Sequence, residues 1–246
     1  MGESQIHSTR KIIMRLVCLT KEEVAKEVAD RILNLVEKKP DCILGLATGS
    51  TPIETYNEII KGSKERHISF KDVKSFNLDE YVNNSDFSQS YRYFMDSHLF
   101  DFIDIKKENT NFPPETNPSS YDEKIDQAGG IDFQILGIGS DGHIAFNEPG
   151  TPFDSKTHIA DLKEETIRDN SRFFASIDDV PTQAVTMGLS TIMKSKEIVL
   201  LAFGKNKAKA IKSMFDKPSI DCPASILSSH PDVTVYCDED AKELLK

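Results

Sequence analysis

The stretch Ile135-Leu-Gly-Ile-Gly-Ser-Asp-Gly-His-Ile-Ala-Phe-Asn-Glu-Pro-Gly150 joins an apolar run to a glycine-rich turn. The apolar run, residues 133–138, has the length and the side-chain branching of a buried strand. Gly137, Gly139 and Gly142 interrupt it, and a backbone this rich in glycine can lie directly against a ligand. The pattern predicts a buried strand that leads into a binding turn.

Three side chains of this turn can carry or orient a proton: Asp141, His143 and Glu148. Histidine exchanges protons near neutral pH, and neighbouring carboxylates orient the ring and raise its basicity. The same residues also fit an ordinary strand-to-helix turn with a surface histidine. The motif taken alone favours neither interpretation, so the rest of the chain has to separate them.

The composition is that of an ordinary soluble protein. The chain has 246 residues, of which 38% are hydrophobic and 28% are charged, and it can bury a substantial core. Residues 1–13 are polar without periodicity and read as a leader or a cloning remnant. We therefore expect residues 14–246 to form a single catalytic α/β domain. The apolar runs are too short to cross a bilayer, so we expect no membrane partner.

Charge and cysteine content narrow the possible partners. A formal charge of −10 argues against binding to nucleic acid, which requires a basic footprint. It also means that an anionic substrate must be held by local positive potential. The four cysteines are scattered, and no two of them have Cys-x-x-Cys spacing. We expect reduced thiols, a cytoplasmic location and no metal site.

A second turn, Thr48-Gly49-Ser50-Thr51, connects the apolar run at 42–47 to a predicted helix. Thr51 suits the N-cap, Pro52 suits the first helical position, and Glu54 completes a capping box. Free amides and the positive end of the helix dipole make such a junction a natural phosphate site. Many turns of this composition bind nothing, so the signal is only moderate by itself.

The order of the elements predicts the fold class. Helical patterns lie at 20–38, after Thr51, and at 88–102, 121–127, 164–170, 205–215 and 241–246. They alternate with strand-like runs at 12–19, 42–47, 73–78, 133–138, 197–203 and 233–237. Such alternation implies a three-layer α/β/α fold, with a doubly wound and mostly parallel sheet.

Unusual residues follow four of these runs directly. They are the Thr48–Thr51 turn, Asp79, the turn from Gly139 to Glu148, and the segment from Gly204 to Lys207. In an open parallel sheet the turns after the strands meet at one edge, where ligands bind. The lysines at the start of the helix at 205–215 have the wrong charge for the helix dipole, which a bound anion would explain. The convergence suggests an enzyme that transfers protons on a small phosphorylated molecule.

Two other segments carry expectations. The helix at 88–102 has an aromatic stripe that we expect to lie in the core, with His98 as a satisfied core histidine; the stripe comprises Tyr91, Phe94, Met95, His98, Leu99 and Phe102. The polar segment at 152–181 comes straight after the central motif. We expect it to act as a lid over the site.

Five motifs together resemble the glucosamine-6-phosphate deaminase family. They are Leu46-Ala-Thr-Gly-Ser-Thr-Pro52, Phe76-Asn-Leu-Asp-Glu-Tyr-Val82, Gly137 to Gly150 with its Gly-His-Ile-Ala-Phe-Asn-Glu-Pro, Asn170-Ser-Arg-Phe-Phe174 and Phe203-Gly-Lys-Asn-Lys-Ala208. The resemblance implies conversion of glucosamine 6-phosphate and water to fructose 6-phosphate and ammonia in amino-sugar catabolism. It also implies a modified Rossmann-like fold, no metal and no organic cofactor.

The resemblance also assigns roles to individual residues. His143 would open the pyranose ring, with Asp141 and Glu148 orienting it, and Asp79 would move a proton between two carbons of the sugar. The residues implied in substrate binding are Thr48, Gly49, Ser50, Thr51, Gly139, Arg172 and Lys207. The residues alone do not distinguish Asp79 from Glu80, and the choice of Asp79 depends on the family motif.

The chain departs from the larger members of that family. Hexameric members carry an allosteric site for N-acetylglucosamine 6-phosphate, built partly from basic residues after the central motif and from a longer C-terminus. Here those positions are His158 and Ala160, and the chain stops at Lys246. The resemblance therefore predicts a shorter, non-allosteric enzyme that is monomeric or weakly associated.

Two alternatives compete with this reading. 6-Phosphogluconolactonase shares the Gly-x-Asp-Gly-His core, but residues 146–149, Phe-Asn-Glu-Pro, and the Asp-Glu-Tyr motif favour a deaminase. A sugar-phosphate sensor domain would require an attached helix-turn-helix, for which 13 leading residues leave no room. The presence of Asp79, Asp141, His143 and Glu148 together also favours catalysis over sensing.

Overall fold

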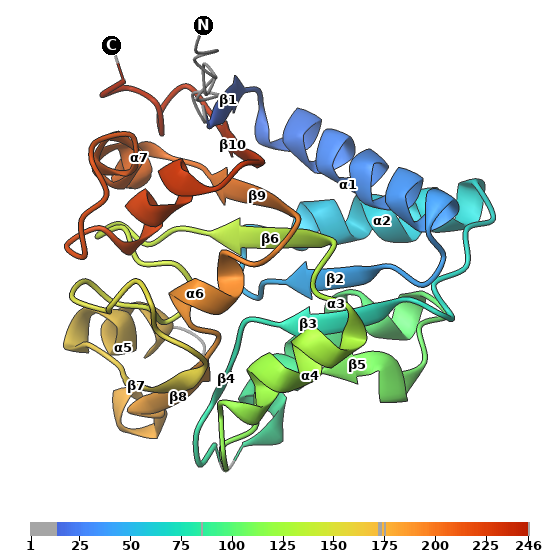
Figure 1. Ribbon diagram of the computed structural model, residues 1–246, viewed down its shortest axis with the longest axis horizontal. Coiled ribbons are helices and arrows are strands. Elements are labelled where there is room, and N and C mark those ends of the chain that lie inside the picture. The colour runs from blue at the N-terminus through green and yellow to red at the C-terminus, as the bar shows by residue number, and fades with distance from the viewer. Residues whose placement is uncertain (1–13, 85, 172–173, 175, 246) are drawn as a thin grey trace, which may run out of the picture.

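A seven-stranded sheet forms the centre of the molecule (Figure 1). The structure is a computed structural model that describes residues 14–84, 86–171, 174 and 176–245. The strand order is β1-β10-β9-β6-β2-β3-β5, and every pair of neighbours runs parallel. The strands are β1 (Arg15–Cys18), β2 (Ile43–Leu46), β3 (Lys74–Asn77), β5 (Thr110–Asn111), β6 (Phe133–Gly137), β9 (Glu197–Ala202) and β10 (Val233–Cys237).

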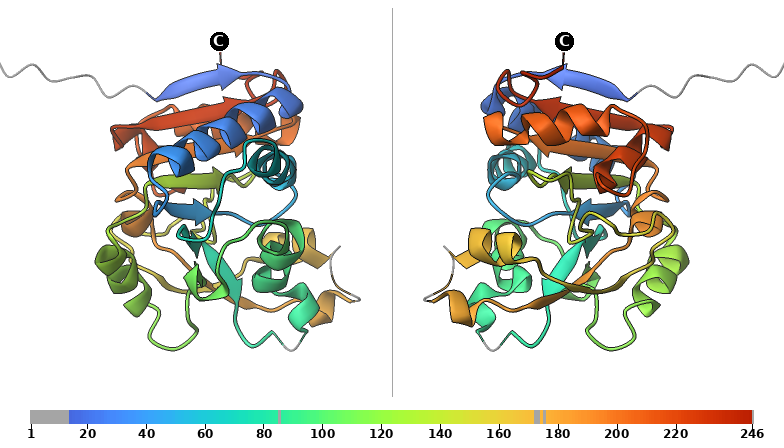
Figure 2. Two further views of the ribbon diagram at one scale, coloured as in Figure 1. Left: turned by 90° about the vertical axis from the view of Figure 1, so that its right-hand side faces the viewer. Right: turned by 90° about the vertical axis from the view of Figure 1, so that its left-hand side faces the viewer.

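Helices cover both faces of this sheet, as the two views of Figure 2 show for α1 and α2 on one side and α7 on the other. The helices are α1 (Lys21–Lys38), α2 (Ile53–Glu65), α3 (Tyr91–His98), α4 (Ser120–Ala128), α5 (Glu164–Asn170), α6 (Leu189–Ile192) and α7 (Ala208–Met214). Short 3-10 helices are η1 (Phe87–Gln89), η2 (Phe100–Phe102), η3 (Lys107–Asn109), η5 (Ile177–Asp179), η6 (Lys205–Lys207) and η7 (Pro223–Ser229). The predicted three-layer α/β/α class, with its parallel sheet, is confirmed.

A second, three-stranded antiparallel sheet was not predicted. It has the order β4-β8-β7, from β4 (Asp79–Tyr81), β8 (Gln183–Thr186) and β7 (His158–Asp161). These strands have three or four residues each and lack long apolar runs, so their sequences carry little strand signal. The strand β7 lies within the segment at 152–181 that we expected to act as a lid.

Helix boundaries follow local chemistry. Thr20 caps α1 with a complete capping box, because its side chain accepts from the Glu23 amide and the Glu23 carboxylate accepts from the Thr20 amide. The predicted helix at 88–102 is shorter, since α3 ends at His98, and Phe102 is 49% exposed rather than in the core. The predicted tail helix at 241–246 is wrong, because its described residues form turns. Among the described residues, no helix is long and apolar enough to cross a membrane.

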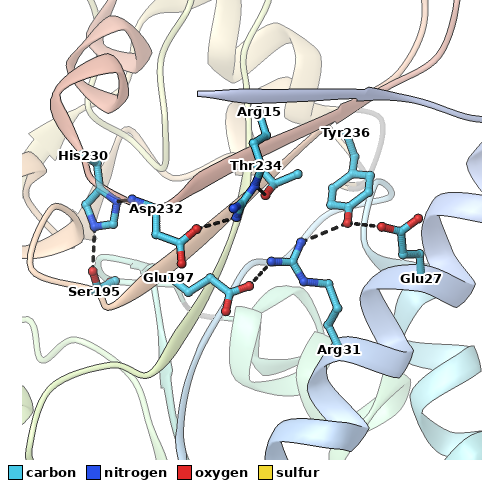
Figure 3. Close-up of polar contacts among 9 residues, drawn as sticks. All are labelled: Arg15, Glu27, Arg31, Ser195, Glu197, His230, Asp232, Thr234 and Tyr236. Atoms are coloured by element: carbon cyan, nitrogen blue, oxygen red, sulfur yellow. Dashed lines mark hydrogen bonds and ion pairs between the residues drawn. The ribbon is translucent and has the colours of Figure 1, made fainter. Parts of the chain in front are cut away.

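Arg31 fastens α1 to the sheet through a half-buried polar network (Figure 3). Its guanidinium pairs with Glu197 of β9 and donates to the Tyr236 hydroxyl of β10 at 2.9 Å. It also stacks near the Phe133 and Tyr236 rings, at 5.6 and 5.9 Å from their centroids. One side chain therefore links a helix to three neighbouring strands.

Replacing Arg31 tests this link. Arg31→Met should lower the free energy of unfolding by about 1–3 kcal/mol, because Glu197 is left half-buried without its cation. Arg15→Met is the matched control, since the Arg15–Asp232 pair is largely exposed and should be worth about 1 kcal/mol or less. Urea unfolding of both variants measures the difference, and equal losses would contradict the proposed role of burial.

Candidate active site

A cavity of about 660 Å³ opens at the carboxyl edge of the parallel sheet. Its lining includes residues from the turns after β2, β3, β6 and β9, among them Thr48–Thr51, Asp79, Gly139, His143 and Lys207. The order of the strands makes these turns neighbours, because β9, β6, β2 and β3 are adjacent in the sheet. The predicted convergence of the four turns is therefore present in the structure. Arg172 lies outside the described residues.

The turn after β2 leaves the start of α2 open. Gly49 has φ +92, a conformation that side-chain-bearing residues rarely adopt. The predicted capping box at Thr51 and Glu54 is wrong: Pro52 is the N-cap, and no side chain caps the helix. Instead the Glu54 carboxylate lies 3.2 Å from the Lys21 ammonium. The first amides of α2 thus lack a side-chain acceptor and lie beside the cavity, as an anion site requires.

Lys207 approaches the cavity from a different element than predicted. The segment at 205–215 is not one helix but η6 followed by α7. Lys205 pairs with Glu243 at 3.2 Å, whereas Lys207 lines the cavity. The Gly204 amide donates to both carboxylate oxygens of Asp238, at 3.0 and 2.9 Å, and this fixes the start of the turn.

Asp79 is the first residue of β4 and is 7% exposed. Burial, with a smaller contribution from the Glu80 charge, raises the pKa of Asp79 to about 8. Desolvation raises the pKa of Tyr56, Tyr91 and Tyr121, which belong to three different helices, and the Asp79 charge adds a smaller contribution to each. A carboxylate that holds its proton this tightly is a strong base once it is ionised.

Glu80 has a different environment, although it is the next residue. Its carboxylate accepts hydrogen bonds from the amides of Tyr81, Tyr91 and Arg92, each at 2.9 Å. Two of these amides begin α3, so Glu80 caps that helix from a neighbouring strand. Asp79 lines the cavity, while the oxygens of Glu80 are engaged with the backbone.

His143 lies between two carboxylates. Its Nδ1 is 2.8 Å from Asp141 Oδ1 and 3.8 Å from Glu148 Oε2, which leaves Nε2 for a bound molecule. Burial tends to raise the pKa of Asp141, but contacts with the His143 side chain and backbone outweigh burial and lower it below its ordinary value. Asp141 therefore stays ionised and holds the orientation of the ring.

Glu148 is the second carboxylate near His143 Nδ1 and is 8% exposed. The Thr166 hydroxyl of α5 donates to Glu148 Oε1 at 2.8 Å, and the Lys163 ammonium is 3.8 Å from Oε2. Within the described part of the chain, Asp141, His143 and Glu148 are the one group whose ligand atoms could hold a metal, all lying within 4.8 Å of one another. The Lys163 ammonium would compete with such a cation.

Gly139 lets the imidazole lie directly on the backbone. A Cβ at this position would be 2.2 Å from His143 Cε1 and 2.3 Å from Nδ1, so no larger residue fits without moving the ring. The Gly139 amide also donates to the His143 carbonyl at 2.9 Å. The glycine-rich turn predicted from sequence thus sets the position of the histidine.

An aromatic wall on one side of the cavity was not predicted. Tyr81, Tyr91, Phe146 and Phe174 contact one another with ring centroids 4.8–6.2 Å apart. Tyr81 and Phe146 belong to the two motifs that carry the acids and the histidine. Their places in those motifs could have indicated from sequence that they line the cavity. Tyr91 and His98, both expected in the core, are only partly buried and line the cavity, although His98 Nδ1 does meet the Phe94 carbonyl at 2.8 Å.

The fold and the cavity define an α/β protein in which an open helix start and a lysine line the same cavity as a buried carboxyl and an imidazole. The chain belongs to the glucosamine-6-phosphate isomerase and 6-phosphogluconolactonase family, whose model matches residues 19–236.

Several relatives and solved structures are similar to this chain. A protein named glucosamine-6-phosphate deaminase from Mycoplasma mycoides subsp. mycoides is 51% identical over 238 residues, covering 94% of this chain and 98% of the relative. One of the same name from Shouchella clausii is 50% identical over 228 residues, covering 89% and 92%. The structure of a monomeric glucosamine-6-phosphate deaminase superposes with a TM-score of 0.89 at 42% identity, covering 94% of this chain and 100% of that one. The 6-phosphogluconolactonase from Thermotoga maritima shares the fold, with a TM-score of 0.72 at 20% identity, covering 92% and 100%.

The buried Asp79 carboxyl should cost stability at high pH. Its pKa in the folded protein is raised to about 8 from an ordinary 3.8, so the folded state keeps a proton that the unfolded chain has lost. The contribution of Asp79 to the free energy of unfolding therefore falls as pH rises from about 4 to about 8. Asp79→Asn lacks this dependence and should be more stable than the unmodified protein at pH 9 but not at pH 4. Urea unfolding at both values checks this, and an equal difference at the two would contradict it.

Proposed function

We propose that this enzyme is a glucosamine-6-phosphate deaminase that converts glucosamine 6-phosphate and water to fructose 6-phosphate and ammonia. The observation that carries the proposal is that Asp79, His143 and Lys207 line one cavity. Two proton carriers and an anion site are what an aldose–ketose isomerisation on a phosphorylated sugar needs. The names of relatives at about half identity support the same activity.

The 6-phosphate would bind between the Thr48–Thr51 turn and Lys207. The open amides at the start of α2 supply hydrogen-bond donors, and the lysine supplies a charge. Arg172 is proposed as a third, bidentate contact on the strength of its motif. Because the overall charge is −10, these local groups must provide the attraction.

Ring opening would belong to His143. Its Nε2 takes the proton from the anomeric hydroxyl and returns one to the ring oxygen, giving an aldehyde at C1 and leaving the amine at C2. The two carboxylates beside Nδ1 stabilise the imidazolium that forms between these steps. Asp141 and Glu148 thus orient the ring without touching the sugar.

Isomerisation would belong to Asp79. Its ionised carboxylate removes the proton from C2, which gives an enolamine, and returns a proton to C1. The nitrogen then forms a ketose imine at C2, where water adds and ammonia leaves. The C1 aldehyde accepts the electron pair left at C2, and the nitrogen lone pair forms the imine as C1 gains its proton. The nitrogen loses one proton and O1 gains one, so the step balances. Because the substrate's own aldehyde is the electron sink, we propose that the reaction needs no metal and no organic cofactor. The burial of Asp79 gives the carboxylate the basicity that carbon acids demand.

The lactonase alternative is supported less well. Solved structures of 6-phosphogluconolactonases share the fold at 16–21% identity, which supports the architecture alone. Lactone hydrolysis gives no role to a buried base that lines the same cavity as the histidine. The burial of Asp79 therefore favours isomerisation.

The proposal is tested by direct assay. The purified protein should release ammonia and fructose 6-phosphate from glucosamine 6-phosphate in equal amounts, and Asp79→Asn should abolish release while still binding substrate. Lactonase turnover without ammonia release would decide for the alternative. A ligand-induced rise in melting temperature without any product would instead indicate a sensor.

The pH dependence of kcat/KM should report Asp79 in the free enzyme. The base must be ionised, so kcat/KM should rise with pH through about 8, where Asp79 loses its proton. Glu80→Gln keeps an oxygen for the amides of α3 but removes the charge, so the rise should move to lower pH. Glu37→Gln, on the far surface of α1, is the control and should leave the profile unchanged. An unmoved profile in Glu80→Gln would count against Asp79 as the titrating base.

We also propose a cytoplasmic, monomeric or weakly associated enzyme without an allosteric site. The similar structure of a monomeric deaminase supports the monomeric state. The four free cysteines fit the reducing conditions of the cytoplasm. His158 and Ala160 lie in β7 rather than presenting a basic cluster. Light scattering should report one chain, and kinetics should be hyperbolic with or without N-acetylglucosamine 6-phosphate. The segment at 152–181 remains a proposed lid.

A further inference from the structure

The turn that carries His143 rests on a segment far along the chain, residues 219–225, here called the support segment. The Ala224 amide donates to the Gly142 carbonyl at 2.9 Å, and the Gly150 amide donates to the Ile220 carbonyl at 2.8 Å. The segment therefore holds the central motif at two points, one residue before the histidine and at the end of the motif.

Cys222 of the support segment also packs directly beneath Gly142. A Cβ at position 142 would be 2.5 Å from Cys222 Sγ and 3.3 Å from its Cα and Cβ, and Gly142 has φ +89. The backbone of the catalytic turn therefore approaches the cysteine as closely as a glycine allows. Cys222 is 6% exposed, so its side chain is packed inside the protein.

The support segment is held together by four internal hydrogen bonds. The buried Ser225 hydroxyl accepts from the Ser219 amide at 2.8 Å and donates to the Ser219 carbonyl at 3.1 Å. The Cys222 amide donates to the Ser219 carbonyl at 3.0 Å, and the Ser225 amide to the Cys222 carbonyl at 2.8 Å. Ala224 and Ser225 are fully buried. These hydrogen bonds link the two ends of the support segment, and its contacts with Gly142 and Gly150 position the turn that carries His143.

We propose that the support segment positions the His143 imidazole, and that Cys222 does so by fixing where the backbone of the catalytic turn lies at Gly142. Cys222 acts through the backbone and is a positioning residue. The imidazole is confined from the other side by Gly139, so a shift at position 142 moves it relative to Asp141. The inference builds on the proposed deaminase activity, because its effect is read partly in turnover.

Cys222→Val tests the proposal, because it adds bulk against Gly142 at a backbone conformation that valine accepts, φ −135 and ψ 87. We expect kcat to fall by about 10- to 100-fold, since a displacement of about 1 Å in a catalytic group costs this much, while KM changes little. Cys222→Ser keeps the size and should retain kcat. Cys42→Val makes the same change at a buried cysteine beside β2 and should lower the melting temperature without lowering kcat.

A second readout does not depend on turnover. The ring signals of His143 in an NMR spectrum, assigned with His143→Gln, should shift in Cys222→Val and stay in place in Cys42→Val. If the unmodified protein released no ammonia, the proposed function would fail while this measurement still decided the positioning role. Ser225→Ala removes the two hydrogen bonds that the Ser225 hydroxyl makes within the segment, and it should also lower kcat. This variant still tests the inference if Cys222→Val folds poorly.

Three results would overturn the inference. The first is a Cys222→Val protein whose kcat and His143 signals match the unmodified protein. The second is an equal loss of kcat in Cys42→Val, which would indicate general destabilisation. The third is a raised KM with unchanged kcat, which would place the effect on substrate binding instead of on the histidine.

Discussion

The parallel direction of the seven strands is the constraint on which the site depends. Parallel strands all end at one edge, and the order β9-β6-β2-β3 makes four functional turns neighbours there. The inner strands β2, β6, β9 and β10 are almost fully buried, so apolar packing holds their register without help from the site. The turns are thus free to carry residues chosen for chemistry, such as glycines with positive φ and an uncapped helix start.

Asp79 shows what the site costs the fold. The Asp79 carboxylate is buried and lies next to the Glu80 charge, so its ionised form is unfavourable. Proton abstraction from carbon needs that same property, because a base that is hard to ionise binds its proton strongly. The amides at the start of α3 donate hydrogen bonds to the Glu80 carboxylate and stabilise its charge. Glu80 therefore caps a helix, whereas the adjacent Asp79 lines the cavity.

The second sheet connects the two proton carriers. Thr186 of β8 is the register partner of Asp79 in β4, and its hydroxyl accepts the Phe146 amide at 3.0 Å. The Asn147 side chain donates to the Met187 carbonyl at 2.9 Å, just beyond that strand. Phe146 and Asn147 are therefore attached to β8 and the residue after it, while Gly142 and Gly150, on either side of them, are attached to the support segment. Both attachments limit how far His143 can move relative to the base.

The sequence by itself determined the parallel α/β class, the turns that meet at the cavity and the residue types in them, because long apolar runs and glycine-rich motifs are local signals. It also indicated Asp141, His143 and Glu148 as one group, and the structure places both carboxylates near Nδ1 of the ring. Only the tertiary structure decided that Asp79 is buried, that Glu80 caps α3 and that Thr51 does not cap α2. It alone revealed the antiparallel sheet and the contact of Cys222 with Gly142. Each of these depends on residues brought together from distant parts of the chain, and no periodicity within one segment records such a contact.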